Sequence, residues 1–164
     1  MPSVLFVCTA NICRSPLAEG LFRLRLQQSG QPLDDWQIGS AGTWTVDGRP
    51  AAPEVIRLMQ ARGVDLSSHR SRMVSTELLA PCNLILTMEH GQKEALRVEF
   101  AALAQRVYLL SEMAGRRMEI EDPFGGPESA YQHAAAEIDF FLAQGWDNLL
   151  RLAGGQEKRT GSQI

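Results

Sequence analysis

Short apolar runs alternate along the chain with longer stretches in which apolar residues recur at helical spacing. The apolar runs, which have the length and composition of buried strands, cover residues 3–7, 36–41, 84–88 and 106–110. The amphipathic stretches, which predict helices, cover residues 15–30, 53–60, 92–103 and 128–152. Because strands and helices alternate, the sequence predicts an α/β fold, a four-stranded parallel sheet with helices on both faces.

The first predicted helix has the clearest start. Ser15 is a residue type preferred at the N-cap, Pro16 suits the first helical position, and Glu19 falls in the first turn. We therefore expect a short loop, residues 9–13, to join the end of the first strand to a helix N-terminus. The carboxyl end of a strand in such a sheet is where active sites are found.

Composition indicates one domain and argues against nucleic acid and anionic membranes as partners. With 164 residues, 45% apolar and 21% charged, the chain has the size and composition of one soluble globular domain. We expect this domain to cover residues 1–153, and the polar, glycine-rich residues 154–164 to form a disordered tail. The net charge of -3 gives no reason to expect nucleic acid or an anionic membrane as a partner.

The cysteines and the absence of long apolar segments indicate the compartment. Cys8, Cys13 and Cys82 are an odd set in a sequence without a recognisable secretion signal, so reduced thiols are expected rather than disulfides. No stretch approaches the roughly 20 apolar residues that a membrane-spanning helix needs. The histidines are scattered and no spacing predicts a metal site. We expect a cytoplasmic protein without a metal or other cofactor.

Cys8 and Arg14 bracket the loop that follows the first strand. The residues between them are Thr9, Ala10, Asn11, Ile12 and Cys13. Inward-pointing N–H groups of such a loop, with the helix dipole, form a site for an anion of the size of phosphate. The same field stabilises a thiolate at the base of the loop, and the guanidinium of Arg14 matches two phosphate oxygens. The sequence therefore predicts a phosphate-binding loop with a reactive thiol.

Two further residues fit this interpretation. Asn11 is one of the few non-glycine types that tolerate a left-handed backbone, and Ser15 is placed to hydrogen-bond the Cys8 sulfur. Taken alone, Cys8 is better explained as a small buried apolar residue and Arg14 as a surface charge. The loop, the helix start and the arginine together favour a catalytic thiol.

The segment from Val7 to Pro16 resembles the signature loop of the low-molecular-weight protein tyrosine phosphatases, which reads Cys-x-Gly-Asn-x-Cys-Arg-Ser. Four further segments occur in that family's order, namely residues 40–43 (SAGT), 68–72 (SHRSR), 84–88 (LILTM) and 122–126 (DPFGG). Three positions differ from the family: Ala10 replaces a glycine, and Asn83 and Glu89 replace aspartates. The resemblance spans nearly the whole chain.

The resemblance implies a two-step hydrolysis without metal. Cys8 attacks phosphorus to give a phosphocysteine, while Asp122 protonates the leaving group and then activates water. It also implies that Asn11, Ser15, Ser40 and His69 brace the loop, although His69 alone could simply cap a turn. Asp122-Pro123 alone would be an ordinary turn.

Other residues receive candidate roles beside this mechanism. Cys13 is a candidate redox partner that traps Cys8 as a reversible disulfide, as in similar proteins, or else a small packed residue. Ile12, Trp44 and Phe124 are candidate walls of the substrate site. Trp44 is alternatively a partly buried core residue.

Three other functions fit parts of the sequence. A protein arginine phosphatase of the same family shares the form of the Phe124 loop, but typically has threonine in place of Ile12; an apolar Ile12 favours phosphotyrosine. A thiol-dependent arsenate reductase needs relay cysteines beyond the third strand, and the sequence has none after Met88. A non-catalytic phosphate-binding module would not need nucleophile, arginine and acid together.

The expected partner is a phosphorylated protein, with phosphotyrosine as the favoured group. From the family resemblance, a tyrosine kinase is one candidate substrate. Inorganic phosphate and other oxyanions are the expected inhibitors, because they would occupy the same loop.

Overall fold

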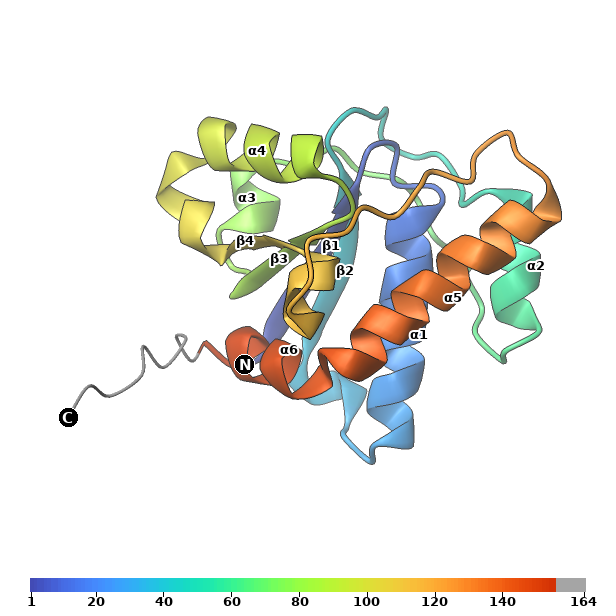
Figure 1. Cartoon of the computed structure of the whole chain (residues 1–164), viewed down its shortest axis with the longest axis horizontal. Helices are drawn as coiled ribbons and strands as arrows, with labels where there is room; N and C mark the ends of the chain where they lie inside the picture. Colours follow the sequence, from blue (N-terminus) through green and yellow to red (C-terminus); the bar gives the residue numbers. More distant parts are fainter. Residues whose placement is uncertain (156–164) are drawn as a thin grey trace.

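The computed structural model of the protein describes residues 1–155 and contains one sheet of four parallel strands (Figure 1). The strands are β1 (Ser3–Cys8), β2 (Gln37–Gly42), β3 (Leu84–Thr87) and β4 (Val107–Leu109). Their order across the sheet is β2-β1-β3-β4, with every neighbouring pair parallel. The predicted α/β fold with a four-stranded parallel sheet is confirmed.

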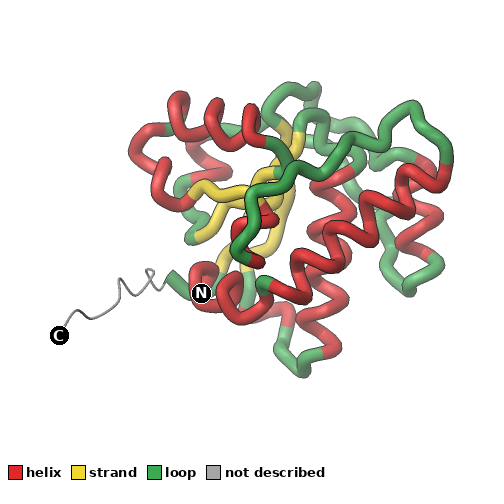
Figure 2. Tube along the Cα trace, viewed as in Figure 1, coloured by secondary structure: helices red, strands yellow, loops and turns green. Residues whose placement is uncertain are grey.

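Helices cover both faces of the sheet, as Figures 1 and 2 show. They are α1 (Arg14–Gln28), α2 (Pro53–Gln60), α3 (Thr76–Leu79), α4 (His90–Glu99), α5 (Glu128–Gln144) and α6 (Trp146–Ala153). Short 3-10 helices cover Leu33–Asp35, Ala101–Arg106 and Leu110–Ala114. Helices α1, α5 and α6 lie on one face, and α3 and α4 lie on the other.

Side chains of β1 divide between two apolar clusters because successive residues of a strand point to opposite faces. Val4 and Phe6 pack in the larger cluster, with the apolar residues of α1, α5 and α6. Leu5 and Val7 pack in the smaller cluster, with those of α3 and α4. All six residues of β1 are buried, which explains why its sequence is continuously apolar rather than alternating.

Several element boundaries differ from the sequence prediction. Helix α1 begins at Arg14, with Cys13 at the N-cap position, so the prediction of Ser15 as the N-cap is wrong. The Ser15 hydroxyl instead lies 3.0 Å from the sulfur of Cys8. The helix predicted for 128–152 is two helices, because the chain turns at Gly145, where a Cβ atom would lie 2.6 Å from Met113.

The strand order places the loop after β1 at the switch point of the sheet. From β1 the chain passes to β2 on one side, and β3 then pairs with the other side of β1. Connections at the carboxyl end of β1 therefore diverge and leave a crevice, which is where doubly wound sheets bind their ligands. Residues 9–13 occupy this position.

The C-terminal part of the domain ends on α6. Gly154 and Gly155 still donate N–H hydrogen bonds to Leu150 and Leu152, at 3.0 Å each. The rest of the predicted tail, residues 156–164, lies outside the described residues. Within residues 1–155, no helix is both long enough and apolar enough to cross a membrane.

Candidate active site

The loop after β1 wraps around a small cavity. Asn11 has φ +58°, and it is the only non-glycine residue in the described part of the chain with a left-handed backbone. Ala10 is thus not in that region, so the alanine that replaces the family's glycine causes no strain. Gly42, at the end of β2, permits the loop to lie close, because a Cβ atom there would be 2.5 Å from the carbonyl oxygen of Thr9.

The carbonyl groups of the loop are bonded to segments outside it. Cys8 O accepts from Thr43 N–H at 2.9 Å, Thr9 O from Trp44 N–H at 3.0 Å, Ile12 O from Ala52 N–H at 2.9 Å, and Asn11 O lies 2.7 Å from His69 Nε2. In a trans peptide, the next N–H points opposite to the carbonyl. The N–H groups of Thr9, Ala10, Ile12 and Cys13 therefore point to the cavity side, and none has an acceptor within residues 1–155. This ring of donors can hold an oxyanion.

Cys8 lies buried at the base of this ring. Its sulfur is 3.0 Å from Ser15 Oγ, and Ser15 Oγ accepts a hydrogen bond from Asn11 Nδ2 at 2.8 Å. Because Asn11 supplies the proton in that bond, the hydroxyl hydrogen of Ser15 is available for the Cys8 sulfur. Ser15 can therefore stabilise a negative charge on Cys8.

Asn11 links the loop to two other segments. Its Nδ2 also donates to Ser40 Oγ at 2.9 Å, and its Oδ1 accepts from Arg72 N–H at 3.0 Å. The contact between its carbonyl oxygen and His69 requires a hydrogen on Nε2 of the imidazole, since a carbonyl only accepts. The structure thus brings together the four predicted bracing residues, Asn11, Ser15, Ser40 and His69.

Arg14 is almost completely buried, with 2% of its side chain exposed. Its Nη1 pairs with the carboxylate of Glu89 and donates to Ile120 O at 2.8 Å. The Nε atom is buried and has no hydrogen-bond partner within residues 1–155. One edge of the guanidinium is thus fixed by the protein, while the Nε–Nη2 edge is available for two oxygens of an anion.

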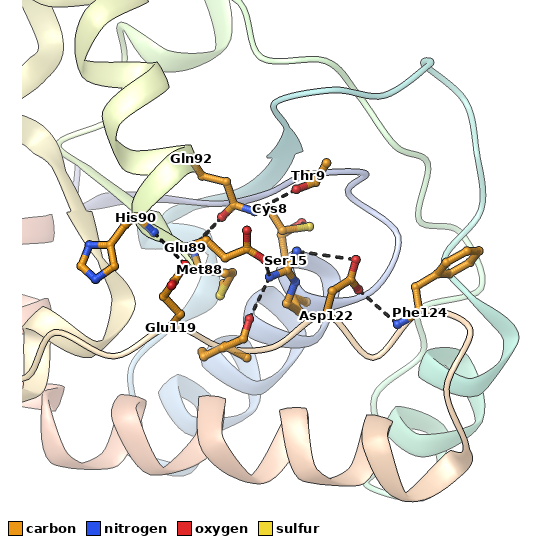
Figure 3. A network of polar contacts seen from close by, with 12 residues as sticks. Cys8, Thr9, Ser15, Met88, Glu89, His90, Gln92, Glu119, Asp122 and Phe124 are labelled. Atoms are coloured by element: carbon orange, nitrogen blue, oxygen red, sulfur yellow. Dashed lines mark hydrogen bonds and ion pairs between the residues drawn. The ribbon is translucent and has the colours of Figure 1, made fainter.

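Asp122 lies at the mouth of the same cavity (Figure 3). Its Oδ2 is 3.7 Å from Nη2 of Arg14, and its Oδ1 accepts from Phe124 N–H at 3.1 Å. About half of the side chain is exposed, so the carboxyl group can exchange protons with solvent.

Cys8, Arg14 and Asp122 line one cavity of about 90 Å³. Its lining residues are Cys8, Thr9, Ala10, Ile12, Cys13, Arg14, Arg49, Asp122 and Phe124. Trp44 is 80% exposed and does not line the cavity, so the alternative of a partly buried core residue is wrong, whereas its role as a substrate wall stays a prediction.

Three other hollows in the described part of the chain, of about 720, 480 and 410 Å³, are larger than this cavity. A groove of about 480 Å³ shares Ile12, Arg49 and Phe124 with it and continues past Glu54 and Tyr131. A hollow of about 720 Å³ lies along β4 and α4 and contains no cysteine. Volume alone therefore does not locate the reactive site; the buried thiol and the unpaired donors do.

Cys13 differs from Cys8 in its surroundings. Burial, together with the nearby Asp122 and Cys8, raises the pKa of the Cys13 thiol to about 12. Cys13 is therefore a neutral thiol at neutral pH and lines the same cavity as Cys8. Burial also raises the pKa of Cys82, which lies outside that cavity and donates to Leu78 O at 3.3 Å.

Sequence reasoning missed three residues of the site. Glu89 and Gln92 form a reciprocal cap at the start of α4, and this pattern of two residues three apart was a readable signal. Arg49 carried no sequence signal, because a lone arginine after a glycine turn is ordinary. Within residues 1–155, no group of three or more histidine, cysteine, aspartate or glutamate side chains is placed to bind a metal ion.

A buried thiol beneath a ring of N–H groups, a buried arginine beside it and a carboxyl group at the mouth are the features expected of a cysteine-dependent phosphatase. Sequence comparison agrees, because the model of the family described as low molecular weight phosphotyrosine protein phosphatase matches residues 3–151. The chain belongs to this family of hydrolases, and the resemblance inferred from its motifs is confirmed.

Individual relatives include enzymes named for two substrates. The chain is 33% identical over 136 residues to a probable low molecular weight protein-tyrosine-phosphatase, EpsP, of Ralstonia nicotianae, covering 83% of this chain and 88% of that protein. It is 30% identical over 142 residues to the protein-arginine-phosphatase of Bacillus subtilis, covering 86% and 92%. A crystal structure of the low molecular weight protein tyrosine phosphatase from T. tengcongensis superposes with a TM-score of 0.84, at 32% identity over 90% of this chain and 99% of that one.

Proposed function

We propose that this protein hydrolyses phosphotyrosine in proteins, with Cys8 as the nucleophile and Asp122 as the general acid and base. The observation that carries the proposal is the unpaired Nε of Arg14, buried in the cavity that also contains Cys8 and Asp122. A buried donor without a partner is costly, so an anionic ligand is the natural acceptor. Phosphate has the charge and the oxygen spacing to bind both this edge and the N–H ring.

In the first step, the Cys8 thiolate attacks phosphorus from the base of the ring. The S–P bond forms as the bond between phosphorus and the phenolic oxygen breaks, and Asp122 transfers its proton to the departing oxygen. Arg14 and the N–H groups of residues 9–13 stabilise the charge on the three remaining oxygens. The products are a phosphocysteine on Cys8 and a dephosphorylated tyrosine side chain in the substrate protein.

In the second step, water replaces the sulfur. Asp122, now a carboxylate, takes a proton from water as its oxygen attacks phosphorus, and the S–P bond breaks to release inorganic phosphate. The contact between Ser15 and the Cys8 sulfur stabilises the departing thiolate. No step requires a metal or an organic cofactor.

Ile12 and Phe124 support phosphotyrosine as the substrate. Both line the cavity around Cys8, and both also line the adjoining groove. An aliphatic side chain and an aromatic ring on opposite segments suit a flat phenyl ring between them. Trp44 does not line this cavity, and its predicted role as a wall has no part in the proposal.

A protein arginine phosphatase is the second candidate. Glu54 lines the groove beside the cavity, and Asp122 lies at its mouth, so two carboxylates face the path of an incoming substrate. Such a pair would favour a positively charged guanidinium group near the phosphate. The 30% identity to a relative named protein-arginine-phosphatase also supports this candidate.

The deciding experiment compares phosphotyrosine and phosphoarginine in peptides of otherwise identical sequence. We expect at least tenfold higher kcat/KM for phosphotyrosine, and no turnover of either peptide by Cys8→Ser. If Ile12 sets the preference for phosphotyrosine, Ile12→Thr should lower the ratio of kcat/KM for phosphotyrosine to kcat/KM for phosphoarginine. A higher kcat/KM for phosphoarginine would replace the proposed substrate, and turnover by Cys8→Ser would overturn the covalent mechanism.

Three further assignments belong to this proposal. The substrate class includes autophosphorylated tyrosine kinases, and inorganic phosphate or other oxyanions are expected to inhibit by occupying the N–H ring. The protein is assigned to the cytoplasm, because its thiol chemistry needs reduced cysteines. Cys13 is assigned the role of redox partner to Cys8, since both line one cavity.

A further inference from the structure

Gln92 is a buried polar residue that none of the steps above uses. Its side chain, on the first turns of α4, is almost fully buried, and the residue is 4% exposed. The amide oxygen accepts from Met88 N–H at 2.9 Å and from Glu89 N–H at 3.0 Å. The amide nitrogen donates to Thr9 Oγ1 at 3.0 Å, across the crevice (Figure 3).

At one end of this side chain lies the start of the phosphate-binding loop. Thr9 is held by its carbonyl, which accepts from Trp44 N–H, and by its hydroxyl, which accepts from Gln92. The N–H groups on both sides of that residue, those of Thr9 and Ala10, belong to the ring that faces the cavity. Restraint of Thr9 therefore sets the direction of two of the four donors.

At the other end lies the turn that carries the partner of Arg14. Gln92 fixes Glu89 twice, since its side chain accepts from Glu89 N–H and its own N–H donates to the Glu89 carboxylate. That carboxylate pairs with Arg14. The same turn also holds the segment before Asp122, because Met88 O accepts from Ile120 N–H at 3.0 Å.

We propose that Gln92 is a positioning residue, which holds the phosphate-binding loop in register with Arg14 through its contacts with Thr9 and Glu89. A helix cap alone would need only the amide oxygen, which a glutamate at this position would equally supply. The nitrogen makes a contact between residues far apart in sequence, and this contact has no capping purpose. The proposal rests on the proposed function only in taking phosphate as the anion of the loop.

Thr9→Val is the sharpest test, because it keeps the shape of the side chain and removes only the hydroxyl that Gln92 binds. The buried Nε2 of Gln92 then lacks an acceptor. We expect the affinity for inorganic phosphate, measured by titration calorimetry, to fall about tenfold. The kcat/KM for p-nitrophenyl phosphate should fall by a similar factor, with the main change in KM. Thr9→Ser, which retains a hydroxyl, should restore both values.

A double-mutant cycle tests whether the two residues act together. Thr9→Val leaves the amide nitrogen of Gln92 without its acceptor. Gln92→Met leaves the Thr9 hydroxyl without its donor and also removes the acceptor of the Met88 and Glu89 N–H groups. Only the double variant removes both groups of the Gln92–Thr9 pair. The loss of phosphate affinity in the double variant should be smaller than the product of the two single losses. A loss equal to that product would contradict action through the Gln92–Thr9 contact.

Ser3→Ala is the matched structural control. Ser3 is as buried as Gln92, and its hydroxyl accepts from Asn83 N–H at 2.7 Å. It lies at the other end of β1, about 17 Å from Cys8 at 3.3 Å per residue. We expect Ser3→Ala to lower the urea midpoint and leave phosphate affinity unchanged.

The outcomes separate this inference from the proposed function. If Thr9→Val keeps wild-type phosphate affinity, or Thr9→Ser fails to restore it, Gln92 is not a positioning residue. If the wild type turns over no phosphoester but binds phosphate in a Thr9-dependent way, the proposed function is wrong and the positioning role is supported.

Discussion

Replacement of Arg14 by lysine is the most informative single change at this site. The guanidinium uses Nη1 for Glu89 and Ile120 O, and it leaves the Nε–Nη2 edge for an anion. Lysine has one ammonium group at the end of its chain. The ammonium group can pair with the Glu89 carboxylate or with the bound anion. It cannot contact both at once, because it lacks the two separate edges of the planar guanidinium.

The size of the loss follows from the number of contacts. A two-point contact with phosphate consists of two charge-assisted hydrogen bonds, each contributing about 1.5–3 kcal/mol. Loss of both corresponds to about 3–6 kcal/mol, which is roughly a 10²–10⁴-fold fall in kcat/KM at 1.36 kcal/mol per factor of ten. Because Arg14 is buried, the variant should also unfold at a lower urea concentration.

The assay is steady-state hydrolysis of p-nitrophenyl phosphate together with calorimetric titration of inorganic phosphate. Arg23→Lys is the control for the substitution, since Arg23 is on the same helix but its partners within residues 1–155 are Ile38 O and the largely buried carboxylate of Glu19, outside the cavity. Arg23→Lys should retain the wild-type kcat/KM for p-nitrophenyl phosphate and the wild-type affinity for inorganic phosphate. If Arg14→Lys retains kcat/KM within threefold of wild type, the two-point contact has no role in catalysis.

Other groups in the site give independent predictions. Asp122→Ala should lower kcat about 10²–10⁴-fold for phenyl phosphate and much less for an activated leaving group; equal loss for both would mean that the acid lies elsewhere. Because the pKa of Cys13 is about 12, iodoacetamide at pH 8 should leave Cys13 unlabelled, as peptide mass spectrometry can show, and labelling should rise only toward pH 12. Hydrogen peroxide should join Cys8 and Cys13 in a disulfide with release of water, whereas Cys13→Ser should give over-oxidised Cys8; over-oxidation in both proteins would contradict the redox role. Burial raises the pKa of Glu19, so the stability it contributes is lost as pH rises through that pKa; Glu19→Gln should therefore raise the melting temperature at pH 7 and have no effect near pH 3.

The fold was predictable because hydrophobic patterning and strand–helix alternation constrain it strongly. The four strands were identified within one or two residues, since each is a short buried run between turns. The break at Gly145 was not predictable, because it depends on close contact with Met113 from a distant segment. The four-residue helix α3 is too short to show periodicity.

The loop residues could be identified from the sequence because the chemistry is contiguous there. The prediction of Ser15 as the N-cap is wrong because it followed the local preference of serine for that position. In the structure, the Ser15 hydroxyl instead contacts the sulfur of Cys8. The exposure of Trp44 was not predictable either, because the direction of a side chain in a loop depends on the segments around it. Glu89, Gln92 and Arg49 join the site through sheet topology, which brings the ends of parallel strands to one edge.

The two edges of the Arg14 guanidinium have different roles: one makes the ion pair that stabilises the buried cation, and the other is available to bind the anion. A buried cation needs a compensating partner, and Glu89 supplies it on the Nη1 side. If the carboxylate instead occupied the Nε–Nη2 edge, the incoming anion would have to displace it before binding. Because Glu89 lies on the Nη1 side, Arg14 is neutralised and oriented before an anion binds, and the anion adds to the existing contacts. Removal of the Glu89 charge therefore has two opposed effects on phosphate binding: it makes the cavity more positive, and it releases the fixed edge of Arg14.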